Sequence, residues 1–472
     1  MNRDLTRGPV TKSMLLFAIP MILGDLLQQC YNIADTLIVG QFLGRDALAA
    51  VGSSFTLMTF LTSIILGLCM GSGALLSMRF GQRDERALCE NLCASFFFIA
   101  LVTVLLNILS FVCLDGLRTF LRVPAEVWGD MREYLFVIFM GIPAVFLYNY
   151  FASFLRAIGN SVIPLGFLAV SAVLNIALDL WFVIGLNRGV AGTAEATVIA
   201  QYVSGIGIAA YAFMRFPQVR SVWELCCLRR GRIQEIVSFS TLTCVQQSIM
   251  NLGILMVQGL VNSFGPVVMA AFAAAVKIDA FAYMPVQDFG NAFSTYVAQN
   301  YGAGQTDRIR KGILQGLVMA AIIGVCSVGL GLLLTIDGAY LHIFLSADKV
   351  TADTIRFGNH FLYVDFSMYL LLCFLFVVRN CVQGIQRAPF VLWAGASELI
   401  ARVAICLTLP ALLSGGVVSA QSPELAFYAL CAADPLACLA ADLVLLVPFF
   451  KNMMHMNYQY LYGGVEQHLL GK

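Results

Sequence analysis

The residue with the clearest potential for chemistry is Asp35, which stands in the middle of a long apolar run within Tyr31–Gly40. The run begins near Ser13 and carries one other charge, Asp25, before Arg45. A transmembrane helix needs about 20 residues, so this run is long enough to span a bilayer. A charge at the bilayer centre costs about 2.5–3.5 kcal/mol and normally faces a partner or water. Asp35 is therefore a candidate proton or cation site, unless it lies near the far end of its helix, within reach of water.

Further charges fall inside apolar runs, at Asp179, Lys277, Asp279, Asp365, Glu398 and Arg402. With Asp35 they make seven, and seven charges facing lipid would cost on the order of 20 kcal/mol. That exceeds the usual folding margin of about 5–15 kcal/mol, so most of them must pair or line an aqueous cavity.

The spacing of these residues suggests roles for some of them. Glu398 and Arg402 are four residues apart on one helix face, which predicts a structural salt bridge. Asn175 and Asp179 have the same spacing, and an amide one turn from a carboxylate suits a proton or cation site. Asp365 is the main acidic candidate in the second half of the chain.

Composition points to a membrane protein. The chain is 60% hydrophobic and 12% charged, whereas soluble domains average about 25% charged residues. A net charge of +1 gives no electrostatic case for nucleic acid. We expect the lipid bilayer as the environment and a monomer as the functional unit.

Enzymatic and cofactor motifs are lacking. The only Gly-Lys dipeptide is the terminal Gly471-Lys472, which excludes a Walker A loop, and the four histidines show no His-Glu-x-x-His arrangement. No cysteine pair has metal-ligand spacing, so we expect no metal, no cofactor and no enzymatic activity. An ion gradient remains as the energy source, at about 2.3 kcal/mol per charge per 100 mV.

Twelve apolar segments predict an all-α membrane protein of twelve transmembrane helices. Lys and Arg gather in the tails and even-numbered loops, which predicts that both termini are cytoplasmic. The Gly67-xxx-Gly71 spacing in the second segment predicts close helix packing. The segments lie near residues 13–40, 48–78, 91–114, 131–154, 161–186, 190–214, 235–262, 267–298, 312–335, 356–380, 389–413 and 424–450.

The two halves of the chain repeat one another. Gln28-Gln29 matches Gln246-Gln247, and at the same offset Asp35 maps onto Gly253. We therefore predict two pseudo-symmetric six-helix lobes, residues 1–214 and 235–472, joined by a cytoplasmic connector over 215–234. Transporters built from such repeats hold their binding sites near the membrane midplane and rock about them.

These motifs, in their order, resemble the multidrug and toxin extrusion (MATE) family in its bacterial form. The resemblance covers essentially the whole chain and rests on Ile19-Pro20, Gln28-Gln29, Tyr31–Gly40, Ala47–Gly52, Leu155–Asn160, Asn175-xxx-Asp179 and Gly192–Thr197. It implies a multi-pass protein of the bacterial inner (plasma) membrane. The implied activity is the export of small amphipathic, often cationic organic compounds in exchange for protons or sodium, by alternating access.

The resemblance also implies roles for individual residues. Asp35 matches the family's cation-coupling aspartate, and Asn175 and Asp179 match its partners on the fifth helix, so sodium at these three residues is the alternative to a proton. Polar positions lining the same lobe's cavity, where substrate would bind, are matched by Gln28, Tyr31, Asn149 and Thr197.

The seventh helix departs from the family pattern. Some members carry an acid there, whereas this chain has Thr243, Gln246 and Gln247. Asp365 in the tenth helix therefore remains the second-lobe candidate.

Two other functions compete with export. A lipid-linked glycan flippase of related two-lobed architecture would need an arginine-rich cavity for pyrophosphate, and Arg402 is the one clear membrane-embedded candidate. A polytopic transferase would need a catalytic cluster at a membrane face, and the sequence shows none. The substrate and the choice between proton and sodium stay open.

Overall fold

The computed structural model describes residues 4–43, 45–116, 125–221, 230–344, 350–419 and 421–469, and these residues form helices joined by turns, without a strand. The helices of the first half are α1 (Val10–Phe42), α2 (Arg45–Gln82), α3 (Glu85–Val112), α5 (Ala125–Phe139), α6 (Ile142–Ala157), α7 (Val162–Leu180), α8 (Gly189–Arg215) and α9 (Pro217–Ser221). Those of the second half are α10 (Arg230–Val261), α11 (Pro266–Gly302), α12 (Thr306–Thr335), α13 (Leu341–Phe344), α14 (Ala352–Ser367), α15 (Tyr369–Gly384), α16 (Ala388–Ser414), α17 (Glu424–Cys431) and α18 (Ala433–Leu469).

The prediction of an all-α membrane protein is confirmed. Within the described ranges, nine helices are long and apolar enough to cross a membrane, and two bent pairs bring the candidate spans to eleven. With α10, which is 32 residues long, a helix lies over each of the twelve predicted segments.

Two spans are bent in the middle. The fourth consists of α5 and α6, which meet at 45°, and the tenth consists of α14 and α15, which meet at 50°. Pro143 stands in the first turn of α6, where a residue without a backbone N–H breaks no helical bond. α6 and α15 both have 16 residues, and each forms the second part of a bent span. The internal repeat is therefore visible in the helix boundaries.

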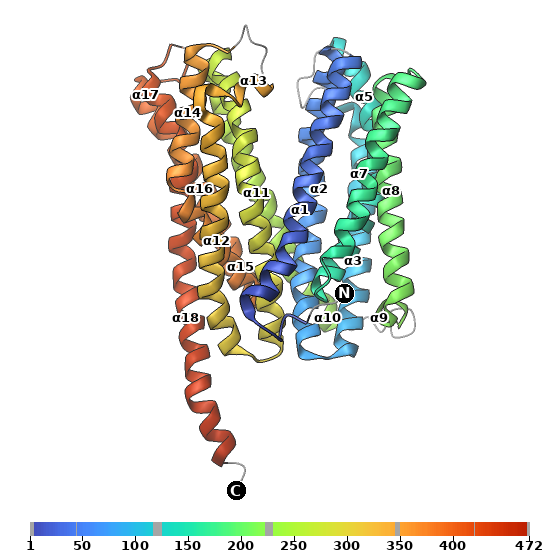
Figure 1. Cartoon of the computed structure of the whole chain (residues 1–472), viewed down its shortest axis with the longest axis vertical. Helices are drawn as coiled ribbons and strands as arrows, with labels where there is room; N and C mark the ends of the chain where they lie inside the picture. The colour runs from blue at the N-terminus through green and yellow to red at the C-terminus, as the bar shows by residue number, and fades with distance from the viewer. Residues whose placement is uncertain are drawn as a thin grey trace. The chain divides into compact units, whose positions relative to one another are not determined.

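The chain separates into two compact units. Unit 1 comprises Met1–Leu5 and Leu15–Val245, and unit 2 comprises Thr6–Met14 and Gln246–Lys472. The division falls inside α10. Residues 222–229 of the predicted connector lie outside the described residues. Figure 1 shows the helices of each unit running alongside one another, coloured blue to green in the first half and yellow to red in the second.

Unit 1 is built around α2, which contacts α3, α5 and α6, while α8 covers α5, α6 and α7. Its core contains the fully buried aromatic side chains Phe139, Tyr150 and Phe154. The Gly67-xxx-Gly71 prediction of close packing is confirmed, because a Cβ at Gly67 would lie 2.6 Å from the Cα of Cys244 on α10. The two backbones meet there because glycine has no side chain.

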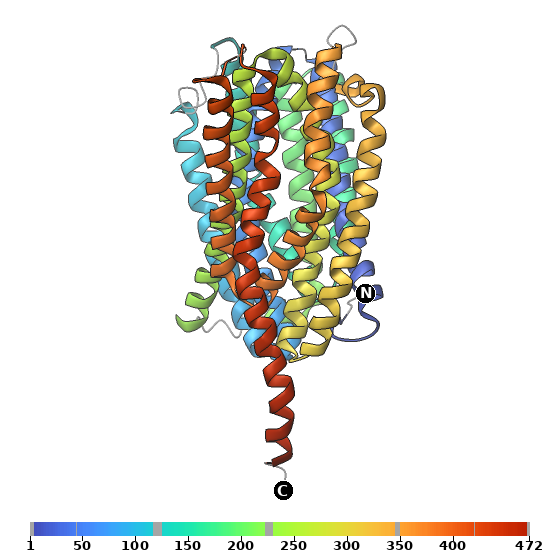
Figure 2. The ribbon, with the colours of Figure 1, turned by 90° about the vertical axis from the view of Figure 1, so that its left-hand side faces the viewer.

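Unit 2 is built around α11, which contacts α12, α14 and α15, while α18 lies along α15 and α16. Its core includes the buried rings of Phe289, Phe293 and Tyr296, stacked along one face of α11. The red helix α18 continues beyond the ends of its neighbours in the same unit (Figure 2).

Candidate functional site

Two carboxyl groups of unit 1 meet between α1 and α7. Asp35 lies on α1 and Asp179 lies in the last turn of α7, and their carboxyl groups are within hydrogen-bonding reach of each other. Asp179 is fully buried, as is Asn175 one turn before it, with 2% of its surface exposed. The structure therefore brings the three predicted cation-coupling residues into one region of unit 1.

The acid pair lacks hydrogen-bond donors. One carboxylate oxygen of Asp35 and both of Asp179 are buried with no N–H or O–H group donating to them from the described residues. Two ionised carboxylates in contact repel each other, and burial adds to the cost. A proton shared by the two groups, or a cation between them, removes this repulsion.

Asn175 adds a fourth unsatisfied oxygen. Its amide Nδ2 donates to Thr197 Oγ1 on α8 at 3.2 Å, and that hydroxyl donates to the carbonyl of Thr193 at 3.0 Å. These two bonds fix the orientation of the amide, and they leave Asn175 Oδ1 buried without a partner among the residues described. The unpartnered atoms of Asp35, Asn175 and Asp179 are thus all acceptors, which is the arrangement that suits a proton or a hard cation.

The backbone changes form directly after Asp179. α7 ends at Leu180 and continues as a π-helix over Trp181–Gly185, in which Leu186 N donates to Trp181 O at 3.0 Å. π-Helical turns are rare and occur frequently at functional sites. Here the wider turn begins two residues after Asp179.

The predicted substrate-binding residues divide into two groups. Gln28 lies within hydrogen-bonding reach of Tyr31, and Tyr31 lies within electrostatic reach of Asp35. Thr197 joins the site through Asn175. Asn149, in contrast, donates to the carbonyl of Val145 within its own helix at 2.9 Å and makes no hydrogen bond to the acid pair in the described structure.

Tyr134 belongs to the same site but has no sequence signal. It is buried on α5, within electrostatic reach of Asp35, Asp179 and Tyr31. Its position in an apolar segment and its lack of charge make it indistinguishable from a core aromatic residue by sequence.

Unit 2 holds a second acid pair. Asp365, in the last turn of α14 before the bend, lies within hydrogen-bonding reach of Asp279 on α11. Asp434 on α18 and Arg402 on α16 are within electrostatic reach of Asp365. Asp365, the second-lobe candidate from the sequence, therefore has an acidic partner in Asp279.

The predicted salt bridge between Glu398 and Arg402 is confirmed at 3.2 Å and is part of a larger network. Arg379 on α15 donates to the other carboxylate oxygen of Glu398, and Arg402 Nε donates to Asp434 Oδ1 at 2.6 Å. A Cβ at Gly253 on α10 would overlap the guanidinium of Arg402. Across the described ranges, no group of three or more His, Cys, Asp or Glu side chains is arranged to hold a metal ion.

Comparison with known proteins identifies relatives along most of the chain. It is 28% identical to the probable multidrug resistance protein YoeA of Bacillus subtilis over 405 residues, covering 84% of this chain and 85% of YoeA. It is 26% identical to the multidrug export protein MepA of Staphylococcus aureus (strain MSSA476) over 328 residues, covering 68% of this chain and 69% of MepA.

Solved structures share the fold. One is the outward-facing conformation of a multidrug resistance MATE family transporter of the MOP superfamily, with a TM-score of 0.84, 20% identity, and coverage of 97% of this chain and 99% of that one. Another is a MATE protein in the straight conformation, with a TM-score of 0.83 and 21% identity, over 96% and 98% of the two chains. The MatE family model matches residues 20–181 and 243–408, which include both acid pairs. The chain therefore belongs to the MatE family, the multidrug and toxin extrusion transporters that its motifs predict.

Proposed function

We propose that this protein exports small amphipathic, often cationic organic compounds across the bacterial plasma membrane, in exchange for protons or sodium. The observation that carries the proposal is the buried contact between Asp35 and Asp179, which has no donor of its own among the described residues. The relatives named for multidrug resistance and multidrug export support the choice of cargo.

In the proposed cycle, the charge of the acid pair controls the distance between α1 and α7. With a proton or cation bound, the two carboxyl groups attract and α1 stays beside α7. When the ion leaves, two like charges face each other in a buried setting and repel. Pro20 lies inside α1, where it removes a helical hydrogen bond and gives the helix a place to bend. Ion release is thereby converted into a change in the shape of unit 1, as alternating access requires.

Substrate contacts are proposed for the polar residues around the pair. Tyr31 already interacts with Asp35, and Thr197 with Asn175. The affinity for a cationic compound bound at Tyr31 and Thr197 would therefore depend on the charge of the acid pair. Gln28 and Asn149 are proposed to supply further polar contacts. Asp365, with Asp279 as its partner, is proposed as a second ion-binding position in unit 2.

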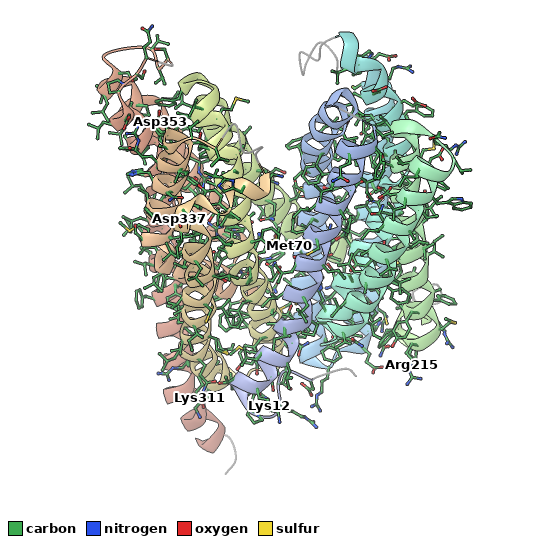
Figure 3. All side chains as sticks on the ribbon, turned by 45° about the horizontal axis from the view of Figure 1, so that its top comes forward. Lys12, Met70, Arg215, Lys311, Asp337 and Asp353 are labelled. Atoms are coloured by element: carbon green, nitrogen blue, oxygen red, sulfur yellow. The ribbon has the colours of Figure 1, made fainter. Side chains whose placement is uncertain are left out.

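The proposed orientation places both termini in the cytoplasm. Within unit 2, Lys12 and Lys311 lie near one end, whereas Asp337 and Asp353 lie near the other (Figure 3). Thr11 donates to Gln315 at 3.0 Å, which places the N-terminal segment beside the first turns of α12. Basic residues favour the cytoplasmic side of a bilayer, so the lysine end is assigned to the cytoplasm. We propose that the monomer is the transporting unit.

The alternative function, a lipid-linked glycan flippase, is less well supported. Its pyrophosphate substrate would need free guanidinium groups. The two buried arginines of unit 2, Arg379 and Arg402, are both engaged with carboxylates.

Transport by the full chain in proteoliposomes tests the proposal. A fluorescent organic cation is the probe, and a pH gradient without sodium and a sodium gradient at equal pH are applied separately. We expect gradient-dependent movement in one of these conditions and none without a gradient. No movement under either gradient, together with gradient-independent movement of a labelled lipid-linked pyrophosphate sugar, would instead identify a flippase.

A further inference from the structure

Asp442 is a buried acid in unit 2 that neither acid pair uses. It lies on α18, only 3% of its surface is exposed, and both of its carboxylate oxygens lack a hydrogen-bond donor among the described residues. An ionised carboxylate left in this state is very costly, because burial removes its water and nothing replaces that hydration. The residue must therefore be neutral or obtain a partner.

The candidate partner is Arg379 on α15, a helix in direct contact with α18. Arg379 and Asp442 are within electrostatic reach of each other. The guanidinium donates to Glu398 and, at 3.2 Å, to Met250 Sδ, but its Nε–H has no acceptor in the described structure. One unused donor and two unused acceptors thus stand on two helices in contact, within electrostatic reach of each other.

The charged side chains around Asp442 explain why no positively charged side chain is paired with it. The helices against α18 contribute the Arg379 guanidinium from α15 and the Glu398–Arg402 pair from α16. Glu398 binds both arginines and Asp434 binds Arg402, so the two positive charges are already matched by two negative ones. Among the described side chains, the other titratable or charged groups on these helices are Tyr369, Cys373 and Cys381 on α15, Cys406 on α16, Asp353, Arg356, His360, Tyr363 and Asp365 on α14, Glu424, Tyr428 and Cys431 on α17, Asp307, Arg308, Arg310, Lys311 and Cys326 on α12, and Asp434, Cys438 and Lys451 on α18 itself.

A proton fits this site better than a metal cation. Sodium would need several oxygen ligands and would be placed next to guanidinium groups that repel it. A proton needs only one carboxylate oxygen, and it removes the charge that makes burial costly.

We propose that Asp442 is a proton-binding site of unit 2, neutral in this structure, whose carboxylate is captured by the free Nε–H of Arg379 when the proton leaves to water. In this exchange the O–H bond of the acid breaks, the proton passes to water, and an ion pair with Arg379 forms. Arg379 then bridges Glu398 and Asp442, so proton loss links α18 more firmly to α15 and α16. The site lies beyond the proposed transport function and does not depend on what the protein exports.

Infrared difference spectroscopy of the full chain in lipid nanodiscs tests the assignment. A protonated carboxylic acid gives a carbonyl stretch that disappears on ionisation. We expect a band in the wild type that is lost at high pH and is missing in Asp442→Asn. The matched control is Asp337→Asn, an exposed acid of the same unit, which should keep the wild-type bands. Proton release over the same pH range should fall by one equivalent per chain in Asp442→Asn only.

Two results would overturn the assignment of Asp442 as a proton-binding site. Identical spectra and identical proton release in the wild type and Asp442→Asn would overturn the proposal. Misfolding of Asp442→Asn would also count against it, because asparagine matches the shape of a neutral aspartic acid. Asp442→Glu provides a second measurement, since it should retain the band at a shifted frequency. Failure of transport in the proteoliposome experiment leaves these spectra unaffected, so the two proposals fail independently.

Discussion

Arg402 lies directly against Gly253, the residue that the internal repeat aligns with Asp35. Because Gly253 has no side chain, the guanidinium occupies the space that a Cβ would fill. Unit 1 therefore carries a carboxylate on its first long span, whereas the equivalent position of unit 2 accommodates a positive charge from α16. The internal repeat therefore does not extend to the charge at this position.

Substitution of Gly253 should be destabilising. In Gly253→Ala the new methyl group overlaps Arg402, which is held by Glu398 and Asp434, and overpacking of this kind costs about 1–3 kcal/mol. The thermal unfolding midpoint of the purified protein should fall. Gly52→Ala is the control, since no atom lies within 4 Å of the position that its Cβ would take and alanine favours a helix interior. An equal rise in both midpoints would contradict the observed close contact.

Removal of the charge on Glu398 should destabilise unit 2 strongly. Glu398→Gln leaves the buried guanidinium groups of Arg379 and Arg402 without their shared carboxylate, and the loss of one partner in a buried pair costs about 3–5 kcal/mol. Asp353→Asn makes a matched control, because Asp353 pairs with Arg356 at 2.9 Å on the surface, where such pairs contribute about 0–1 kcal/mol. Chemical or thermal unfolding would compare the two. Similar losses in both variants would show that the network is not buried as described.

The hydroxyl of Thr197 should affect ion coupling through Asn175. Thr197→Val keeps the side-chain shape but removes the acceptor for the Asn175 amide, which is then free to turn its oxygen away. An unsatisfied buried group costs about 1–3 kcal/mol, so the coupling-ion concentration for half-maximal transport should rise about tenfold. Thr197→Ser restores the hydroxyl and should restore the wild-type value. An unchanged ion dependence in Thr197→Val would remove Asn175 from the proposed site.

The helices were predictable because apolar runs bounded by charged and glycine-rich breaks leave few alternatives in a bilayer. The bends in the fourth and tenth spans were harder to predict from the sequence. Pro143 marks the first of them, but the break at Met368 carries neither proline nor glycine. Backbone geometry there depends on packing with neighbouring helices rather than on local residue preference.

The candidate site was predictable where its residues share one helix. Asn175 and Asp179 are four residues apart, as are Glu398 and Arg402, so spacing alone places each pair on one face. Asp279 and Asp365 come from α11 and α14, and the proximity of Asp442 to Arg379 joins α18 to α15. Such contacts depend on how the helices pack, and no periodicity in a single sequence reports them.

Asp35, together with Asp179, is proposed to couple an ion gradient to export. The most direct measurement compares gradient-driven uptake of a fluorescent cation into proteoliposomes containing wild type, Asp35→Asn or Asp115→Asn, with folding checked by the thermal unfolding midpoint. Asp115 is an exposed acid of unit 1, paired with Arg132 at 2.8 Å, and its substitution should leave transport intact. We predict that Asp35→Asn folds normally and loses gradient-driven transport. Wild-type transport by Asp35→Asn would contradict it.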